Sequence, residues 1–205
     1  MESYQPHTLD YPQWLQALQS FLNETLRPIL PNDEDRYLLL DARAMNIWAK
    51  AFTHEAVDPT DNYEELEFIG DEILDTCFCK YLMRRFPHLR KREYTELKAT
   101  YMSKIRQAPV SRQIGLSDYV RVTGIVRSSL NIDGDVFESF FGALDTVSDL
   151  VKEGNGYINC FNMVIHLYNN IEIIEDLAEG STKTQVIQMF TRFDLPHPEE
   201  DVVDG

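Results

Sequence analysis

The sequence has only three cysteines and no long uninterrupted apolar segment. Cys77 and Cys79 lie two positions apart and Cys160 is distant from both, so we expect reduced thiols instead of a disulfide framework or a zinc knuckle. No apolar run approaches the roughly twenty residues that a membrane span needs, and no charged segment followed by an apolar core opens the chain. These absences predict a soluble, intracellular protein with no membrane partner, and they do not distinguish cytoplasm from nucleus.

Basic residues are also scarce. The chain has 19 Lys and Arg against 34 Asp and Glu, which gives a formal net charge of -15. This balance argues against nucleic-acid binding, because Lys and Arg contacts to phosphate supply most of the non-specific affinity. Six of the basic side chains nevertheless cluster together: Arg84, Arg85, His88, Arg90, Lys91 and Arg92. The cluster either contacts a phosphate backbone or complements the C-terminal dipole of the preceding helix and keeps a loop solvated, and both interpretations stay open.

What the sequence does contain predicts an all-α fold. Hydrophobic residues make up 43% of the chain and aromatic residues 11%, which is enough for a sizeable core. Apolar residues recur at helical spacing, and no convincing β-hairpin pattern occurs before residue 157. We expect helices over residues 11–26, 42–52, 62–82, 94–103, 104–114 and 132–151, and a further helix from residue 157. Residues 1–175 would form one domain, and residues 176–205 a linker, a terminal helix and an acidic tail.

The segment of residues 62–82 carries two parallel stripes. The apolar one predicts a buried face and comprises Leu66, Ile69, Ile73, Leu74, Cys77, Phe78, Tyr81 and Leu82. The acidic one comprises Glu64, Glu67, Asp71 and Asp75. Like charges at this spacing oppose a helix by about 0.2 to 0.5 kcal/mol per pair, and no Lys or Arg occurs between Asp61 and Lys80 to relieve them. A solvated acidic face is one interpretation of this pattern.

An interior glycine and a second segment favour a different interpretation. Gly70 costs a helix about 1 kcal/mol relative to alanine, which suggests a close backbone approach. Residues 132–151 form another helical stripe: Ile132, Val136, Phe137, Phe140, Phe141, Leu144, Val147 and Val151. On its edge, Asp135 and Glu138 lie one turn apart, with Gly142 one turn further. Two such helices can pack closely and direct four carboxylates at one point.

Four carboxylates share a low-dielectric site as anions only if a cation neutralises them. Oxygen ligands without cysteine or paired histidine select Mg²⁺ or Mn²⁺ over zinc. A cation held in this way can generate hydroxide and stabilise the leaving oxygen of a phosphodiester. The two acidic segments therefore indicate a candidate site for phosphodiester hydrolysis.

The same residues resemble a known family. The run Tyr63-Glu-Glu-Leu-Glu-Phe-Ile-Gly-Asp resembles the ribonuclease III signature, and Gly134-Asp-Val-Phe-Glu-Ser resembles its second acidic motif. Phe52-Thr-His-Glu and Leu97-Lys-Ala extend the resemblance over roughly residues 52–144. It implies a helical endonuclease domain that cuts double-stranded RNA with Mg²⁺, or Mn²⁺ as a substitute. It also implies four metal-binding catalytic carboxylates: Glu67, Asp71, Asp135 and Glu138.

The resemblance further implies a homodimer that leaves staggered ends with 3′ overhangs. Phe68 matches the aromatic residue that in the family enters a pocket on the partner subunit; the alternative places Phe68 in its own subunit's core. Two residues depart from the family pattern. Asp133 stands where an apolar residue is usual, and Ser103 replaces a common asparagine.

RNA contacts are less well defined by the sequence. The candidates are Glu64, Arg84, Arg85, Arg90, Lys91, Arg92 and Arg127, the last from a mixed segment of residues 120–130 that we read as a loop. Residues 181–190 resemble the opening helix of a double-stranded-RNA-binding domain, but the chain stops at Gly205, before that domain's sheet. An ordinary terminal helix followed by an acidic tail fits equally well.

Two other functions compete with the nuclease. A catalytically silent domain of the same fold, used as a scaffold or RNA-binding module, would be expected to lack at least one metal ligand. A di-iron carboxylate bundle would need two Glu-x-x-His pairs, and the sequence has none. His54 alone is better explained as a packing or capping residue. The four intact carboxylates favour the endonuclease.

Overall fold

The computed structural model describes residues 9–122, 130–171 and 173, and this part of the chain is helical with short connections. Its elements in order are α1 (Tyr11–Leu26), α2 (Asp33–Leu38), α3 (Ala42–Ala51), α4 (Glu64–Arg85), α5 (Lys91–Tyr101), α6 (Lys104–Gln113), the 3-10 helix η2 (Leu116–Tyr119), α7 (Leu130–Val151) and α8 (Asn155–Tyr168). The only bridge between extended residues in the described part is the isolated Thr53–Arg121 pair. The all-α prediction is confirmed. Among the described helices, none combines the length and apolar character needed to cross a membrane.

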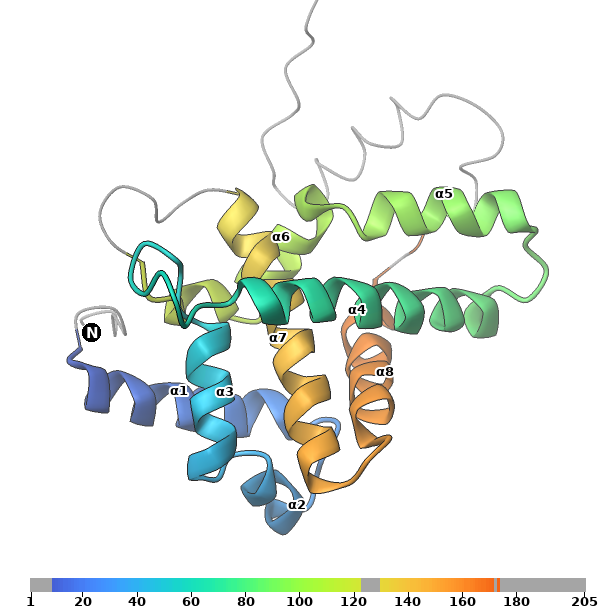
Figure 1. Cartoon of the computed structure of the whole chain (residues 1–205). Coiled ribbons are helices and arrows are strands. Elements are labelled where there is room, and N and C mark those ends of the chain that lie inside the picture. The colour runs from blue at the N-terminus through green and yellow to red at the C-terminus, as the bar shows by residue number, and fades with distance from the viewer. Residues whose placement is uncertain (1–8, 123–129, 172, 174–205) are drawn as a thin grey trace, which may run out of the picture.

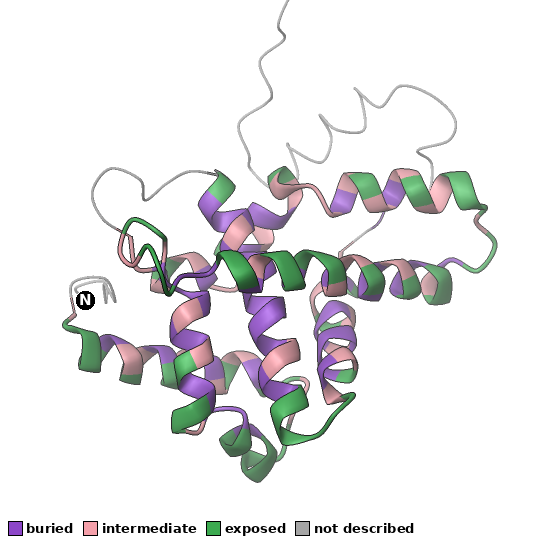
Figure 2. Cartoon of the chain, in the orientation of Figure 1, coloured by how far each residue is buried: buried purple, intermediate pink, exposed green. Residues whose placement is uncertain are grey.

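Helix α7 is the centre of the fold. It packs against α3, α4, α6 and α8, and Figure 1 shows it between α3 and α8, beneath α4. Its predicted apolar stripe is buried from Ile132 to Val147. Figure 2 shows this helix as predominantly buried, whereas α4 exposes one long face to solvent. The core therefore lies around α7, and α4 separates it from the exterior.

Two glycines allow α4 and α7 to cross with their backbones in contact. A Cβ atom added at Gly70 of α4 would lie 1.7 Å from the carbonyl oxygen of Glu138, and one added at Gly142 of α7 would lie 1.9 Å from that of Leu66. No side chain fits at either position without separating the helices. The close approach predicted from the interior glycines is confirmed, and it fixes where the acidic residues of the two helices meet.

Helix ends follow local side-chain chemistry. Asp10 and Asp41 accept hydrogen bonds from the first-turn amides of α1 and α3, from Gln13 N at 3.0 Å and from Ala44 N at 2.8 Å. Asn62 Oδ1 likewise accepts from Glu64 N at 3.1 Å, although α4 begins at Glu64 instead of Asn62. Gly115 follows α6 in the left-handed region at φ 85° and ends it, as its position predicts.

Several expectations differ from the structure. Ile69 and Val151, assigned to buried stripes, are 40% and 41% exposed, because within the described residues the helices packed on α4 and α7 leave these two positions open. The short elements α2 and η2 were not predicted. The predicted helix of residues 181–190, the boundary at residue 175 and Arg127 lie outside the described residues. The cysteines are free thiols, with Cys77 and Cys160 buried, as expected.

Candidate active site

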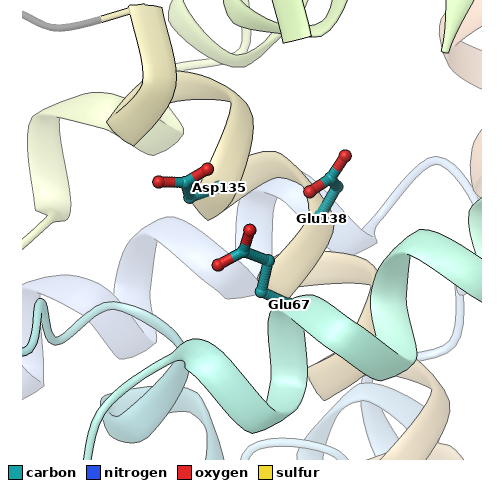
Figure 3. Close-up of side chains that lie close together, drawn as sticks. All are labelled: Glu67, Asp135 and Glu138. Atoms are coloured by element: carbon teal, nitrogen blue, oxygen red, sulfur yellow. The ribbon is translucent and has the colours of Figure 1, made fainter. Parts of the chain in front are cut away.

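Three carboxylates converge where α4 crosses α7. Glu67 comes from α4, and Asp135 and Glu138 come from successive turns of α7, so that the three side chains face one another (Figure 3). Each contributes one oxygen to a group whose members all lie within 4.8 Å of one another. The Glu138 side chain is only 5% exposed, that of Asp135 15% and that of Glu67 24%. The cluster is therefore most buried at Glu138 and most exposed to solvent at Glu67.

Asp71, the fourth predicted ligand, is not part of this group. It lies one turn after Glu67 on α4 and is exposed. The part of Asp71 that is shielded from water still raises its pKa by desolvation, and the nearby Asp75 and Glu72 charges raise the pKa further. Its own charge in turn helps to raise the pKa of Glu138. The structure thus brings together three of the four predicted carboxylates and places Asp71 beside them, and its role as a ligand stays a prediction.

A lysine from a third helix enters the cluster. The Lys104 ammonium of α6 donates to Glu67 Oε1 at 2.8 Å and to Asp135 Oδ1, and lies 3.8 Å from Glu138 Oε2. Its stem packs on Gly134, where an added Cβ would lie 3.0 Å from Lys104 Cβ. Sequence reasoning missed Lys104 because it lies 31 residues before Asp135 and follows no charge pattern.

Burial dominates the electrostatics of the cluster. It raises the pKa of Glu138 to about 7, and Lys104 offsets only part of this effect. Burial also raises the pKa of Glu67, where the Asp135 charge adds to it and Lys104 opposes it. Three acids around one lysine leave an excess of negative charge. An oxygen-only donor set with such an excess fits a divalent cation of the Mg²⁺ or Mn²⁺ type.

Tyr63 supports the cluster from the turn before α4. Its hydroxyl donates to Asp135 Oδ2 at 3.2 Å. Burial raises the pKa of Tyr63, and the Asp135 charge raises it further, so the phenol stays protonated as a donor. The other Asp135 oxygen receives Lys104. Asp135 is therefore held in one orientation by two partners that are distant from it in sequence.

Part of the negative charge on and near α4 is neutralised by lysines of other helices. Lys98 of α5 pairs with Asp75, and Lys50 of α3 lies 2.5 Å from Glu65 and 3.7 Å from Asp61. The absence of basic residues within the segment is thus compensated by other helices. Glu64 and Asp71 remain exposed, so the solvated-face interpretation describes only part of the stripe.

The unusual acid at position 133 has a partner. Asp133 is buried, and its Oδ2 accepts a hydrogen bond from Arg112 Nε of α6 at 2.6 Å. This ion pair joins α6 to α7 two residues before Asp135. Ser103 precedes α6, and its hydroxyl donates to the Thr100 carbonyl at 2.8 Å. Both departures from the family pattern are accommodated without disturbing the carboxylates.

The basic cluster lies at the other end of α4. Arg84 is 17 residues after Glu67, or about 25 Å along the helix. Arg85 donates to Tyr81 Oη at 2.6 Å and to the Tyr168 and Ile171 carbonyls at 2.9 and 3.0 Å. The Arg85 guanidinium therefore makes its hydrogen bonds within the domain. For this reason we do not retain Arg85 as a candidate RNA contact. Arg84 stacks over the Phe161 ring at 4.4 Å, and Arg90, Lys91 and Arg92 are exposed.

Phe68 and His54 resolve two further alternatives. Phe68 is 73% exposed, directly beside the exposed Ile69, so the interpretation that places it in its own subunit's core is wrong.

His54 Nδ1 accepts a hydrogen bond from Ala56 N at 3.0 Å, and its ring packs edge-on against Tyr63 at 5.6 Å. His54 has the capping and packing role expected for it.

Comparison with solved structures identifies the class of fold. Two structures of the nuclease domain of ribonuclease III from Campylobacter jejuni superpose with TM-scores of 0.55 and 0.56 at 21% identity. They cover 70% and 74% of this chain and 94% and 97% of theirs. The fold is therefore that of a helical ribonuclease III nuclease domain.

Sequence comparison shows which proteins the chain resembles. Residues 64–146 match the Ribonuclease III domain family model. A Frog virus 3 protein provisionally named ribonuclease 3 is 28% identical over 168 residues, 76% of this chain and 45% of its own length. The ribonuclease 3 of Zunongwangia profunda is 28% identical over 141 residues, 64% of this chain and 56% of its own. The chain thus spans about half the length of these relatives, and its similarity to ribonuclease III includes the domain match at residues 64–146.

Proposed function

We propose that the protein is a divalent-metal-dependent endoribonuclease that hydrolyses phosphodiester bonds of double-stranded RNA. The observation that carries this proposal is the convergence of Glu67, Asp135 and Glu138 within 4.8 Å in a chain that is similar to ribonuclease III. Their relative position depends on the close crossing of α4 and α7, which the missing Cβ atoms of Gly70 and Gly142 allow.

The donor set supports Mg²⁺, with Mn²⁺ as a substitute. Glu67, Asp135 and Glu138 would hold the ion, and Asp71 would join them from the next turn of α4. When bound, such an ion stabilises charge on the phosphoryl oxygens and activates water for attack. The residues of the protein itself position the carboxylates. Tyr63 holds the Asp135 carboxylate by its hydrogen bond, and the burial of Glu138 fixes it against α4.

The charge distribution limits where RNA can bind. Around the carboxylates the surface is acidic, so a bound ion would have to offset repulsion of the phosphates. The exposed residues Arg90, Lys91 and Arg92 follow the end of α4, and Arg84 in the last turn of α4 lies about 25 Å along the helix from Glu67. An extended duplex along α4 would reach both places, whereas a short oligonucleotide would not. This geometry favours a long double-stranded substrate.

Phe68 supports a homodimer. Phe68 is 73% exposed and adjoins Ile69, which is 40% exposed, so the two form an apolar contact surface. Burial of the Phe68 ring in a partner would stabilise the dimer by about 1.5 to 3 kcal/mol per copy. The Campylobacter jejuni nuclease domain has a region involved in dimer formation. In a two-fold dimer each subunit would bring one set of carboxylates and cut one strand, leaving staggered ends with 3′ overhangs.

Incubation with a long RNA duplex tests the proposal. We expect cleavage with millimolar Mg²⁺ and none in EDTA. Glu138→Gln should lower the rate by about a hundredfold or more, the cost typical of losing a group that stabilises the transition state. Glu153→Gln, at an exposed residue between α7 and α8, is the matched control and should cleave normally. A folded wild-type protein that leaves the duplex intact would instead identify a catalytically silent domain.

A further inference from the structure

We propose that Lys104 is an internal counter-ion that occupies the carboxylate cluster and competes with the divalent ion for it. The inference rests on the proposed function and adds to it how access of the ion to the site is controlled. Lys104 lies on α6, outside the two helices that carry the acids. Its role is therefore separate from that of the ligands.

The ammonium lies where the carboxylates converge. It contacts Glu67 Oε1 at 2.8 Å and Asp135 Oδ1, and lies 3.8 Å from Glu138 Oε2. These are the residues whose oxygens lie within 4.8 Å of one another. One lysine thus bridges all three acids, two by hydrogen bonds and the third by charge.

The side chain is directed to this point by its stem. Lys104 Cβ and Cγ pack against Gly134, where an added Cβ would come within 3.0 Å of both atoms. Gly134 directly precedes Asp135, so the stem and its acidic partner are held together on adjoining helices. The side chain is nevertheless 41% exposed. The ammonium can therefore leave toward solvent without any movement of the helices.

An ammonium and a divalent ion cannot use the same oxygens at once. Mg²⁺ requires oxygens at about 2.0 to 2.1 Å in octahedral geometry, and two cations at this separation repel each other strongly in a half-buried site. The ion must therefore displace Lys104 from Glu67 and Asp135. Three acids around a single positive charge favour the exchange, because a divalent ion neutralises more of the cluster.

This competition predicts the sign of a mutational effect. If Lys104 competes, its removal should strengthen metal binding. If Lys104 only holds the carboxylates in place, its removal should weaken metal binding. Lys50 provides a matched control, because it pairs with Glu65 on α4 from the neighbouring helix α3, and Glu65 is not one of the predicted metal ligands.

The experiment is a titration of the full chain with MnCl₂, followed by calorimetry or by the spin signal of free Mn²⁺. Lys104→Met should lower the dissociation constant by about five- to tenfold, the low end of typical coupling between two sites because the lysine is partly exposed. Lys104→Arg keeps the charge and should stay near the wild-type value. Lys50→Met should also bind as wild type does.

Thermal unfolding gives a second readout. In EDTA, Lys104→Met should melt below wild type because the acids lose their counter-ion, and Mn²⁺ should raise its melting temperature by more than it raises that of wild type. If the variant is unfolded in EDTA, refolding on Mn²⁺ addition supports the proposal and failure to refold overturns it. Equal or weaker Mn²⁺ binding by Lys104→Met also overturns it. A wild type that neither binds Mn²⁺ nor cleaves RNA removes the proposed function and this inference together.

Discussion

Glu138 combines burial with two acidic neighbours, and this combination sets its proton affinity. Its pKa is raised to about 7, first by burial and then by the Asp71 and Glu67 charges. In the unfolded chain a glutamate titrates near about 4.3. Between these two values the folded state binds more protons than the unfolded state, so folding stability falls as pH rises through this window. Above about pH 7 the full penalty of an ionised buried acid is present.

Replacing this acid by an amide should remove the pH dependence. In EDTA, Glu138→Gln should be more stable than wild type at pH 8 by about 1 to 3 kcal/mol, and the difference should disappear near pH 5, where wild-type Glu138 is protonated. Chemical denaturation at a series of pH values measures this. Glu153→Gln, at an exposed position, is the control and should follow wild type throughout. A variant less stable than wild type at pH 8 would contradict the buried-charge explanation.

At this scale the sequence identified the acids but not their partners. The spacing of Glu67, Asp135 and Glu138 and the family resemblance led directly to them. Tyr63 and Lys104 were missed as site residues because they reach Asp135 across 72 and 31 positions. Such contacts depend on how helices are placed against one another, which periodicity within one segment does not encode.

At the scale of elements, the glycine pair carries the most specific sequence information. Gly70 and Gly142 occupy helix interiors at a cost in propensity, and the structure shows that each faces the partner's backbone. Helices 62–82 and 132–151 were correctly paired on this basis. Elements of six and four residues, α2 and η2, are too short for a periodic pattern and were not predicted. Ile69 followed the apolar period of α4 but is 40% exposed in the described part of the chain.

Gly70→Ala tests the crossing. The added methyl would meet the Glu138 carbonyl oxygen at 1.7 Å, a backbone atom that cannot move independently. We expect destabilisation by about 1 to 3 kcal/mol or more, although alanine has the higher helix propensity. Gly134→Ala is the control for a milder clash, because its methyl would meet the flexible Lys104 side chain at 3.0 Å. This substitution should destabilise the protein less than Gly70→Ala. Urea unfolding of both variants measures the difference, and equal stability of Gly70→Ala and wild type would refute the close crossing.

For the whole molecule, charge and exposed apolar surface point to different partners. The net charge of -15 does not describe the surface evenly, because acids gather at the site and exposed basic residues at the start of α5. The basic residues are consistent with a long RNA duplex as a partner, and the acidic site is consistent with a divalent ion. Phe68 is explained by neither, since it is apolar and exposed and directly follows Glu67 of the acidic cluster on α4.

Phe68→Ala links that exposed ring to the form of the product. Because Phe68 is 73% exposed, its removal should change the stability of the isolated subunit by no more than about 0.5 kcal/mol. If the ring is buried twice in a two-fold dimer, at about 1.5 to 3 kcal/mol per copy, the dimer dissociation constant should rise by about 10² to 10⁴. Sedimentation velocity of wild type and variant measures this. Tyr37→Ala removes an equally exposed ring, 70% accessible on α2, and should leave the dimer intact.

The product follows from the same symmetry. Two carboxylate sets related by a two-fold axis should cut both strands at a fixed stagger, whereas one subunit alone would cut one strand. A duplex with each strand separately labelled should therefore give paired cuts with wild type and Tyr37→Ala. With Phe68→Ala, at concentrations where the variant is monomeric, the paired cuts should be lost while the Mn²⁺ affinity is unchanged, because Glu67, Asp135 and Glu138 all belong to one subunit. A wild-type protein that is monomeric at micromolar concentration and nicks only one strand would contradict the dimer.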